Sequence, residues 1–336
     1  VTLASFVQEE AGNDQDDNVA QVFRNMVLDR EEELESGDML MIVKNNYYWM
    51  EEERKKIKER QLSEERKVKS EESAFGGRRE SQFNSLTNHK VQCSKFKVQS
   101  KMIKIQNLKK IYNGNTVLDI DNLGVAKGEL IGLVGNNGAG KTTLLRLILD
   151  LIQADDGFVE SNGQKVNESE TWKEYTGSYI DGRFLIDFLT PEEYFDFIAD
   201  VYNIDDKTLQ ERLAQFEGFM HDEIMGTKKY LRDFSQGNRQ KIGIIGAMII
   251  NPKVLLLDGP FNYLDPSSQM TIAHMIQRIC KEQGTTVIIS SHNLNFVADI
   301  SSRILLLEKG KLVKDLPNAD GAAIAELNEY FGIQAE

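Results

Sequence analysis

Short apolar runs that end at turn residues recur along the C-terminal two thirds of the chain. Runs at residues 129–134, 253–258 and 304–307 consist mostly of Leu, Ile and Val, which is typical of strands buried inside a sheet. Residues 102–108 and 117–120 predict two further strands, and the Asn-Gly-Asn sequence between them predicts a turn. We therefore expect a folded domain that begins near residue 102.

Helical patterns follow several of these strands. The apolar stretch at 144–149 predicts a helix directly after the 129–134 strand, and helices are also predicted at 236–250 and around 322–330. Pro191 predicts the start of another helix, because proline is favoured at the first helical position and the two glutamates after it complement the helix dipole. Strands and helices thus alternate, as they do in α/β proteins.

The first part of the chain differs in character. Residues 17–34 predict an amphipathic helix, whereas 51–69 is nearly all charge and predicts a helix surrounded by solvent. Residues 70–101 are rich in Ser, Gln, Asn and Lys and predict a linker. We interpret 1–101 as a partly helical, flexible N-terminal extension. It is either an arm that binds a partner or a tail unrelated to the chemistry, and the lack of any motif favours the tail.

The composition describes an ordinary globular protein. Of its 336 residues, 40% are hydrophobic and 28% charged, and no apolar run approaches the length of about 20 residues that spans a membrane. The net charge of -13 argues against binding to nucleic acid, which depends on Lys and Arg. Cys93 and Cys280 offer neither a disulfide framework nor a metal-ligand spacing, and the N-terminus shows no leader pattern. We therefore expect a cytoplasmic protein.

The segment between the 129–134 strand and the 144–149 helix fits the phosphate-loop pattern G-x-x-x-x-G-K-[ST] at every fixed position. Its glycines let the backbone wrap around phosphate oxygens, and the following helix directs unpaired N–H groups at them. Lys141 is expected to reach the β- and γ-phosphates, and Thr142 to place its hydroxyl on Mg²⁺. The predicted nucleotide-binding residues here are Gly135, Asn136, Asn137, Gly138, Ala139, Gly140, Lys141, Thr142 and Thr143.

Several downstream motifs come in the order and at the spacing of one family. Asp258 ends an apolar strand, after the sequence Phe-Ser-Gln-Gly-Asn-Arg-Gln-Lys at 234–241. Tyr-Leu-Asp-Pro follows at 263–266 and Ser-Ser-His at 290–292. Together with the phosphate loop, these motifs resemble the nucleotide-binding subunit of an ATP-binding-cassette (ABC) transporter. The resemblance covers about residues 102–315.

The resemblance implies roles for three catalytic residues. Asp258 would be the Walker B acid that faces Mg²⁺ together with Thr142, and His292 would be the switch histidine near the γ-phosphate. Asp181 stands where the family usually has glutamine, sometimes glutamate, and would also belong to the metal region. The expected metal ligands are therefore Thr142, Asp181 and Asp258. Taken alone, His292 could be a hydrogen-bonded turn residue.

The resemblance also implies nucleotide contacts outside the phosphate loop. Tyr112 would stack on the adenine ring, and Asp265 would belong to the D-loop. Ser235 and Gly237 stand at the serine and second glycine of the family signature, which face the γ-phosphate held by the opposite subunit. Taken alone, Ser235 could be simply the N-cap of the 236–250 helix.

The fold, cofactors and partners follow from the same resemblance. The fold would be α/β, a P-loop core with a mainly parallel sheet, a small antiparallel β subdomain and a helical subdomain inserted at about 188–250. Residues 316–336 would form a short C-terminal helical tail. ATP and Mg²⁺ would be the cofactors. The partners would be a second ATP-binding subunit, identical or different, and a separate membrane permease that holds the chain at the inner face of the cell membrane. The segment at 179–181 and the single short cassette suggest an exporter.

One departure from the family bears on the reaction. The residue after Asp258 is Gly259, where the family has a glutamate that polarises the attacking water. Loss of a positioned general base costs about 10²–10⁴ in rate. The resemblance makes a transporter ATPase the leading function. Gly259 supports the alternative, which is a regulatory subunit that binds ATP and scarcely hydrolyses it. A soluble ABC protein acting on ribosomes or nucleic acid is a third reading, disfavoured by the charge and by the lack of tandem cassettes.

Overall fold

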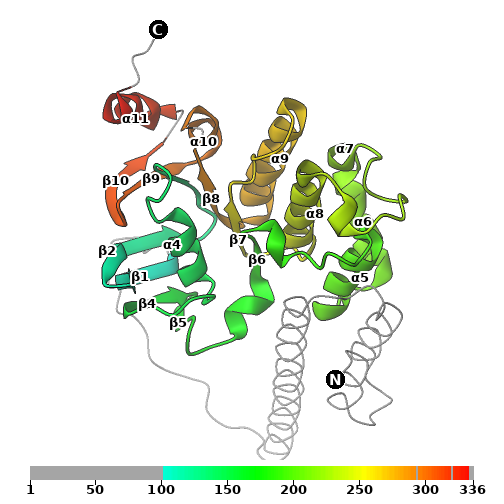
Figure 1. Cartoon of the computed structure of the whole chain (residues 1–336), viewed down its shortest axis with the longest axis horizontal. Coiled ribbons are helices and arrows are strands. Elements are labelled where there is room, and N and C mark those ends of the chain that lie inside the picture. The colour runs from blue at the N-terminus through cyan, green and yellow to red at the C-terminus, as the bar shows by residue number, and fades with distance from the viewer. Residues whose placement is uncertain (1–100, 293, 319–320, 333–336) are drawn as a thin grey trace, which may run out of the picture. The chain divides into compact units, whose positions relative to one another are not determined.

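The structure is a computed structural model that describes residues 101–292, 294–318 and 321–332 (Figure 1). Apart from Lys101, the extension predicted at 1–101 lies outside these residues. In the part that is described, two β-sheets and their helices form an α/β domain, as predicted. No helix there combines the length and the apolar character needed to span a membrane.

A four-stranded antiparallel sheet is built from the first strands of the domain. Its first hairpin turns at Asn113 and Gly114, whose φ angles of 50° and 78° are left-handed, as such a turn requires. The ladder continues to the pair of Tyr112 and Asn115, so both strands are longer than their apolar pattern predicted. The sheet has the order β2-β1-β4-β5, with β1 (Lys101–Tyr112), β2 (Asn115–Ala126), β4 (Asp156–Ser161) and β5 (Gln164–Lys165).

A second, six-stranded sheet forms the centre of the domain and has the order β10-β9-β3-β8-β7-β6. All neighbouring strands in it are parallel except β9 and β10, which are antiparallel. The mainly parallel sheet predicted from the resemblance is thus confirmed. Its strands are β3 (Leu130–Val134), β6 (Thr176–Tyr179), β7 (Val254–Asp258), β8 (Thr286–Ser291), β9 (Arg303–Glu308) and β10 (Lys311–Pro317).

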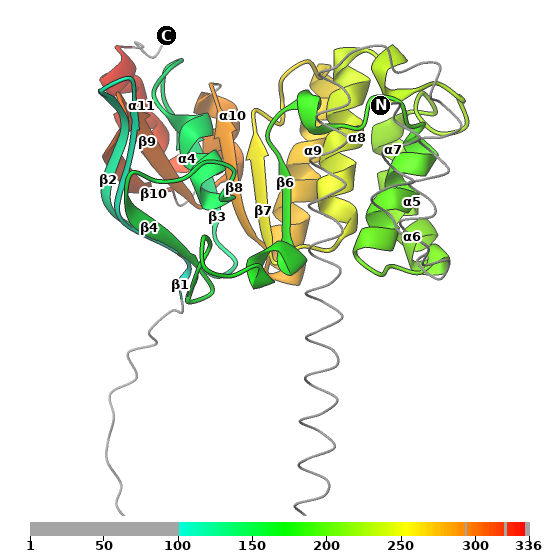
Figure 2. The same ribbon diagram turned by 60° about the horizontal axis from the view of Figure 1, so that its bottom comes forward.

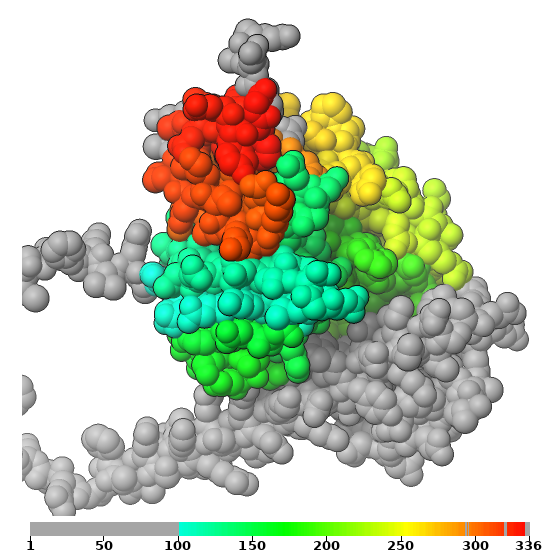
Figure 3. All heavy atoms as spheres, turned by 60° about the vertical axis from the view of Figure 1, so that its left-hand side comes forward, coloured from blue at the N-terminus to red at the C-terminus, as the bar shows by residue number. Residues whose placement is uncertain are grey.

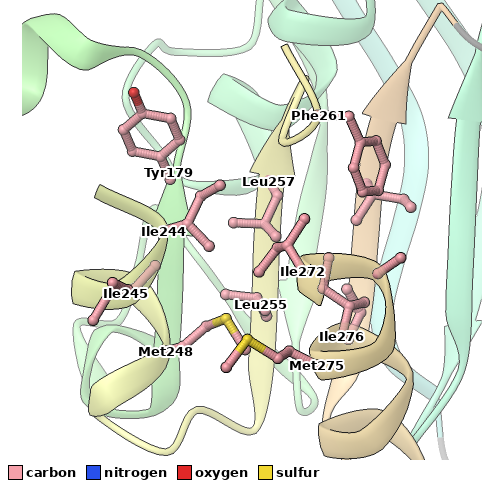
Figure 4. Close-up of a cluster of buried hydrophobic side chains, with 14 of the residues drawn as sticks. Tyr179, Ile244, Ile245, Met248, Leu255, Leu257, Phe261, Ile272, Met275 and Ile276 are labelled. Carbon is pink, nitrogen blue, oxygen red and sulfur yellow. The ribbon is translucent and has the colours of Figure 1, made fainter. Parts of the chain in front are cut away.

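The parallel strands β3, β7, β8 and β9 supply side chains to two hydrophobic cores, because successive residues of a strand point to opposite faces. Leu256 of β7 belongs to the core that contains α4 (Lys141–Ile148) and the antiparallel sheet. Its neighbours Leu255 and Leu257 belong to the core on the other face, where they point toward α8 and α9 (Figure 4). Burial on both faces explains why these strands read as continuous apolar runs.

The chain segment between β6 and β7 forms the inserted helical subdomain, which lies beyond the β6 edge of the parallel sheet (Figures 1 and 2). Its first helix begins at Pro191, as predicted, and Thr190 and Glu193 close that end with reciprocal capping hydrogen bonds. The helices are α5 (Pro191–Val201), α6 (Asp206–Leu213), α7 (Glu217–Met220) and α8 (Gln236–Ile249).

Glycines on α8 let this helix pack closely against β6 and α5. A Cβ atom at Gly243 would lie 2.1 Å from the Tyr179 ring, and one at Gly246 would lie 3.0 Å from the Tyr194 ring. Burial raises the pKa of Tyr179 to about 12, so its hydroxyl stays neutral. The Tyr179 ring, at the end of β6, therefore packs against α8, the helix that carries the signature residue Gly237.

Three helices follow strands of this sheet: α9 (Pro266–Arg278) follows β7, α10 (Leu294–Ile300) follows β8, and α11 (Ala323–Phe331) follows the antiparallel strand β10. Where the two sheets meet, the backbone N–H of Asp119 in β2 donates a hydrogen bond of 2.8 Å to the Gly310 carbonyl in the β9–β10 turn. A Cβ at Gly310 would lie 2.5 Å from the Val117 carbonyl oxygen, so only glycine allows this approach. Figure 3 shows this face, with β1 and β2 in cyan below β10 in orange and α11 in red.

Candidate functional site

The phosphate loop connects β3 to α4 and owes its shape to glycine. Gly135, Gly138 and Gly140 have φ angles of 151°, 78° and 105°, which other residues rarely adopt. At Gly135 a Cβ would lie 2.2 Å from the Leu307 carbonyl oxygen, so the loop enters against β9 without room for a side chain. At Gly138 a Cβ would meet nothing within 4 Å, so this part of the loop borders open space.

The start of α4 is suited to an anion. Its N-cap residue is Gly140, and no side chain caps the helix there. The first N–H groups of a helix have no partner within the helix, and they carry the positive end of its dipole. Three glycines in unusual conformations and an uncapped helix start fit phosphate, which has oxygen atoms to accept these hydrogen bonds.

Lys141 brings positive charge into this loop. Its side chain is 7% exposed, and Nζ donates hydrogen bonds to the carbonyl oxygens of Gly135 at 2.6 Å and Asn136 at 3.1 Å. Burial lowers the pKa of Lys141, and the charge of Asp258 acts in the opposite direction. A phosphate in the loop would supply a stronger partner for this ammonium group than the two carbonyls do.

Thr142, Asp258 and Ser290 form a hydrogen-bonded group beside the loop. Thr142 Oγ1 donates to Asp258 Oδ2 at 2.5 Å, and Ser290 Oγ donates to Asp258 Oδ1. These residues come from the start of α4 and from β7 and β8, which are neighbours in the sheet. The Ser290 contact was not predicted from the sequence, although its position near the end of the strand that precedes His292 offered a hint.

The oxygen atoms of Thr142 and Asp258 fit Mg²⁺, which prefers oxygen ligands and binds proteins through one or two side chains together with phosphates and water. In the described residues, no cluster of three or more His, Cys, Asp or Glu side chains could hold a metal ion by itself. A Mg²⁺ ion here would therefore depend on phosphate oxygens for the rest of its coordination.

A cleft of about 440 Å³ brings four of the predicted residues together: Thr142, Asp181, Asp258 and His292. Its lining also includes residues that the sequence did not single out, among them Arg183, Gln240 and Asn262. Gln240 lies within the 234–241 motif, and Arg183 and Asn262 lie close in sequence to Asp181 and Asp258, but no sequence pattern assigns a role to any of the three side chains.

Asp181 is held by a neighbouring arginine. Its Oδ2 accepts hydrogen bonds from Arg183 Nε at 2.9 Å and from Arg183 Nη2 at 2.6 Å, and its Oδ1 accepts one from the Arg183 backbone N–H at 3.0 Å. The Arg183 guanidinium lowers the pKa of Asp181, and the more distant charge of Arg146 adds to this effect. Asp181 is therefore a charged carboxylate whose oxygens already have a cation.

His292 follows β8 and is exposed at the cleft. Partial burial lowers its pKa, the nearby charge of Lys141 lowers it further, and Asp258 acts in the opposite direction. The imidazole is therefore neutral at pH 7, with one ring nitrogen to donate and one to accept a hydrogen bond.

Other predicted residues do not line this cleft. Tyr112 ends β1 with 44% of its surface exposed, and Lys110 Nζ lies 5.1 Å from the centre of its ring. Asp265 caps α9 by accepting hydrogen bonds from Ser267 Oγ at 2.5 Å and Ser268 N at 3.0 Å, which hold its pKa below the usual range. Both roles implied by the resemblance stay predictions.

Ser235 and Gly237 of the signature do not line the cleft that contains Thr142. Ser235 caps α8, its Oγ accepting from Asn238 N at 3.2 Å, and it lines a second hollow of about 400 Å³. Gly237 is required for packing, because a Cβ there would lie 2.6 Å from the Tyr263 carbonyl oxygen. Within one chain, these residues therefore do not share the hollow that holds Thr142 and Asp258.

The fold and the site define a P-loop nucleotide-binding domain. The family model described as "ABC transporter" matches residues 118–262. The chain is 32% identical over 220 residues to the bacitracin transport ATP-binding protein BcrA of Bacillus licheniformis, covering 65% of this chain and 70% of that protein. It is 31% identical over 233 residues to the lantibiotic transport ATP-binding protein SrtF of Streptococcus pyogenes, covering 69% and 97%. The chain belongs to the ABC transporter family, as an ATP-binding subunit.

A solved structure supports the fold. The ATP-binding cassette MJ0796, a dimer in a post-hydrolysis state bound to ADP and Pi, superposes with a TM-score of 0.59 at 23% sequence identity. The match covers 65% of this chain and 99% of that one. The inserted helical subdomain and the antiparallel β subdomain expected for the family are both present here.

Proposed function

We propose that this chain binds ATP with Mg²⁺ and hydrolyses it to drive a separate membrane permease. The observation that carries the proposal is the hydrogen bond between Thr142 and Asp258 at the mouth of a phosphate loop whose lysine is turned inward. This arrangement sets a hydroxyl and a carboxylate beside a loop whose lysine carries a positive charge. Membership of the ABC transporter family supports ATP as the nucleotide.

In the proposed complex, the loop amides and Lys141 bind the β- and γ-phosphates, and Lys141 leaves the carbonyls of Gly135 and Asn136 to do so. Thr142 and Asp258 would hold Mg²⁺ between them. The ion would supply charge neutralisation at the phosphates. Neutral His292 would donate a hydrogen bond to a γ-phosphate oxygen from the same cleft.

Asp181 would join the metal region only after exchanging its partner. Its carboxylate is paired with Arg183, whose side chain is 80% exposed. An exposed ion pair contributes about 0–1 kcal/mol, so a Mg²⁺–phosphate group can replace it. We propose that Asp181 then turns to the ion or its water while Arg183 becomes free for phosphate.

We further propose a dimer as the working unit. Ser235 lines a hollow distinct from the cleft of Thr142, so within one chain its hydroxyl would be unused by the nucleotide. A second ATP-binding subunit would present this serine, Gly237 and Asp265 to the γ-phosphate. Closure of the dimer would then depend on ATP and would be lost when the γ-phosphate is removed.

The membrane partner is proposed from the relatives. BcrA and SrtF are named as transport ATP-binding proteins for bacitracin and a lantibiotic. We infer for this chain an exporter of a similar kind, with a permease as the second component and a position at the inner face of the cell membrane.

Tyr112 would stack on the adenine ring, since it is an exposed aromatic at the end of β1.

A second candidate function is a regulatory subunit that binds ATP and scarcely hydrolyses it. The observation that favours it is Gly259, which leaves the position after Asp258 without a carboxylate. Binding through Lys141, Thr142 and Asp258 does not need that carboxylate, so ATP could still close a dimer.

Two measurements on the full chain test these proposals. Calorimetric titration with ATP, in Mg²⁺ and then in EDTA, should give a lower dissociation constant with Mg²⁺. No binding in either buffer would refute the proposed function. Phosphate release from the complex with the co-purified membrane protein separates the candidates. Sustained release that depends on the permease supports the ATPase, whereas ATP binding without release supports the regulatory subunit.

A further inference from the structure

The peptide groups around Gly259 are fixed on both sides. The Gly259 N–H donates to the Ser290 carbonyl at 3.1 Å and to Ser290 Oγ at 3.0 Å. Its carbonyl oxygen accepts from Gln240 Nε2 at 2.8 Å and from the Asn262 backbone N–H at 3.0 Å. Gly259 is held at a φ of +58°, in the left-handed region. These hydrogen bonds anchor the turn from Asp258 to Asn262 to Ser290 of β8 and to Gln240 of α8.

The side chain of Asn262 fills the space next to Gly259. A Cβ atom built on Gly259 would lie 2.3 Å from Asn262 Nδ2 and 3.1 Å from its Cγ. The carboxamide thus occupies the volume in which any side chain at 259 would begin. Asn262 is exposed and lines the same cleft as Thr142, Asp258 and His292. The position of the Asn262 side chain thus depends on residue 259 being glycine, because any Cβ there would collide with the carboxamide.

Some other polar groups of the cleft are already engaged. Asp181 is paired with Arg183, and His292 lies within the influence of Lys141 and Asp258. Among the described residues, the Asn262 carboxamide has no hydrogen-bond partner, so both its oxygen and its N–H₂ group are available to water.

We propose that Asn262 positions the water that attacks the γ-phosphate, in place of a carboxylate at residue 259. The proposal rests on the proposed function. An amide is too weak a base to remove a proton, but phosphoryl transfer has a loose transition state in which orienting the nucleophile matters, and amide side chains do this in other nucleotide hydrolases. Oδ1 would accept a hydrogen bond from the water, and Nδ2 would donate one to the water oxygen.

The step balances without a protein base. The water oxygen forms a bond to the γ-phosphorus as the bond from that phosphorus to the bridging oxygen breaks. The electron pair of the broken bond stays on the oxygen of ADP. The proton lost by the water passes to a γ-phosphate oxygen or to solvent. Asn262 keeps all of its protons, so no ionisation of this residue enters the rate.

The first test compares Asn262→Ala with Asn122→Ala, which removes an exposed asparagine of β2 outside the cleft. Removing a group that orients the reacting atoms typically costs about 10²–10³ in rate. We expect Asn262→Ala to lower the single-turnover hydrolysis rate by about 100-fold, with ATP affinity within about twofold of the unmodified chain. Asn122→Ala should change neither. The affinity for ADP with aluminium fluoride, which mimics the transition state, should fall together with the rate.

The second test is Asn262→Asp, which places a carboxylate where the carboxamide lies. A positioned base contributes about 10²–10⁴ in rate, so turnover should rise by at least about tenfold and should now decline as the pH falls through the pKa of the new acid. The unmodified chain should show no such decline from residue 262.

The outcomes separate this inference from the proposed function. An unmodified chain that fails to bind ATP refutes the proposed function. A chain that binds ATP normally and hydrolyses it equally well with Asn262→Ala overturns only the role of Asn262. A chain that binds ATP but shows no hydrolysis overturns that role and also the proposed ATPase, and supports the regulatory subunit. Far-ultraviolet circular dichroism and the ATP affinity of each variant exclude misfolding as the cause of a lower rate.

Discussion

The hydroxyl of Thr142 donates a 2.5 Å hydrogen bond to Asp258, a residue 116 positions away in the chain. The phosphate loop and the carboxylate that ends β7 are thereby joined by a direct hydrogen bond. An ion bound to both residues would replace this hydrogen bond by coordination. In the proposed complex, the pair would thus supply two oxygen ligands for Mg²⁺.

We predict that Thr142→Val weakens binding of ATP in Mg²⁺ by about tenfold or more, the loss typical for removal of a group that supports a metal. Valine keeps the shape of threonine but has no oxygen for the ion. Calorimetry in EDTA should show the affinities of variant and unmodified chain nearly equal. Thr116→Val, on an exposed position of β2, is the matched control. A loss of the same size in EDTA would mean that Thr142 does not act through the metal.

Gly259→Ala should lower the free energy of unfolding by about 1–3 kcal/mol, because a residue other than glycine is strained in the left-handed region. The added Cβ would also meet Asn262 Nδ2 at 2.3 Å. Gly218→Ala on α7 is the control, since its Cβ would meet nothing within 4 Å. That control should be stabilising by about 0.4–1 kcal/mol. Urea unfolding of both variants measures the difference, and equal midpoints would contradict the geometry of the turn at Gly259.

The pair of Asp181 and Arg183 predicts a pH-dependent contribution to stability. Arg183 lowers the pKa of Asp181 in the folded protein below its unfolded value of about 3.9. The stabilising contribution is therefore present above about pH 4 and is lost as the pH falls through the folded pKa.

Arg183→Ala should accordingly reduce the urea unfolding midpoint at pH 7 and reduce it less at pH 3. Lys207→Ala, which removes an exposed lysine 3.9 Å from Glu211, is a control for the loss of a surface cation. If Arg183→Ala lost the same stability at both pH values, the ion pair would not be the source of the effect.

The sequence predicted the parts of this protein that depend on local pattern. The apolar runs marked β3, β7 and β9 because these strands are buried on both faces. Pro191 marked a helix start because it cannot donate a backbone hydrogen bond. The phosphate loop was recognisable because its glycines, Lys141 and Thr142 stand at fixed spacing within one short segment.

The other contacts of the site could not be predicted from local sequence patterns. The Arg183 partner of Asp181 has no fixed spacing in a known motif, and the closeness of Asn262 to Gly259 depends on a left-handed backbone conformation that the residue name alone does not reveal. The sequence showed that Gly259 lacks the carboxylate expected at this position. The structure adds that the Asn262 side chain occupies the place of a Cβ at residue 259. The contact of Ser290 with Asp258 depends on the register of β7 and β8.

The central claim is that the loop of residues 135–143 binds ATP through Lys141. The most direct measurement is calorimetric titration of the full chain with ATP and Mg²⁺, for the unmodified protein, for Lys141→Ala and for Lys127→Ala, whose lysine is exposed outside the loop. We predict that Lys141→Ala weakens binding by at least about tenfold, because charge-assisted hydrogen bonds to phosphate are lost. Lys127→Ala should bind as the unmodified chain does. Equal ATP affinity in all three proteins would contradict the account.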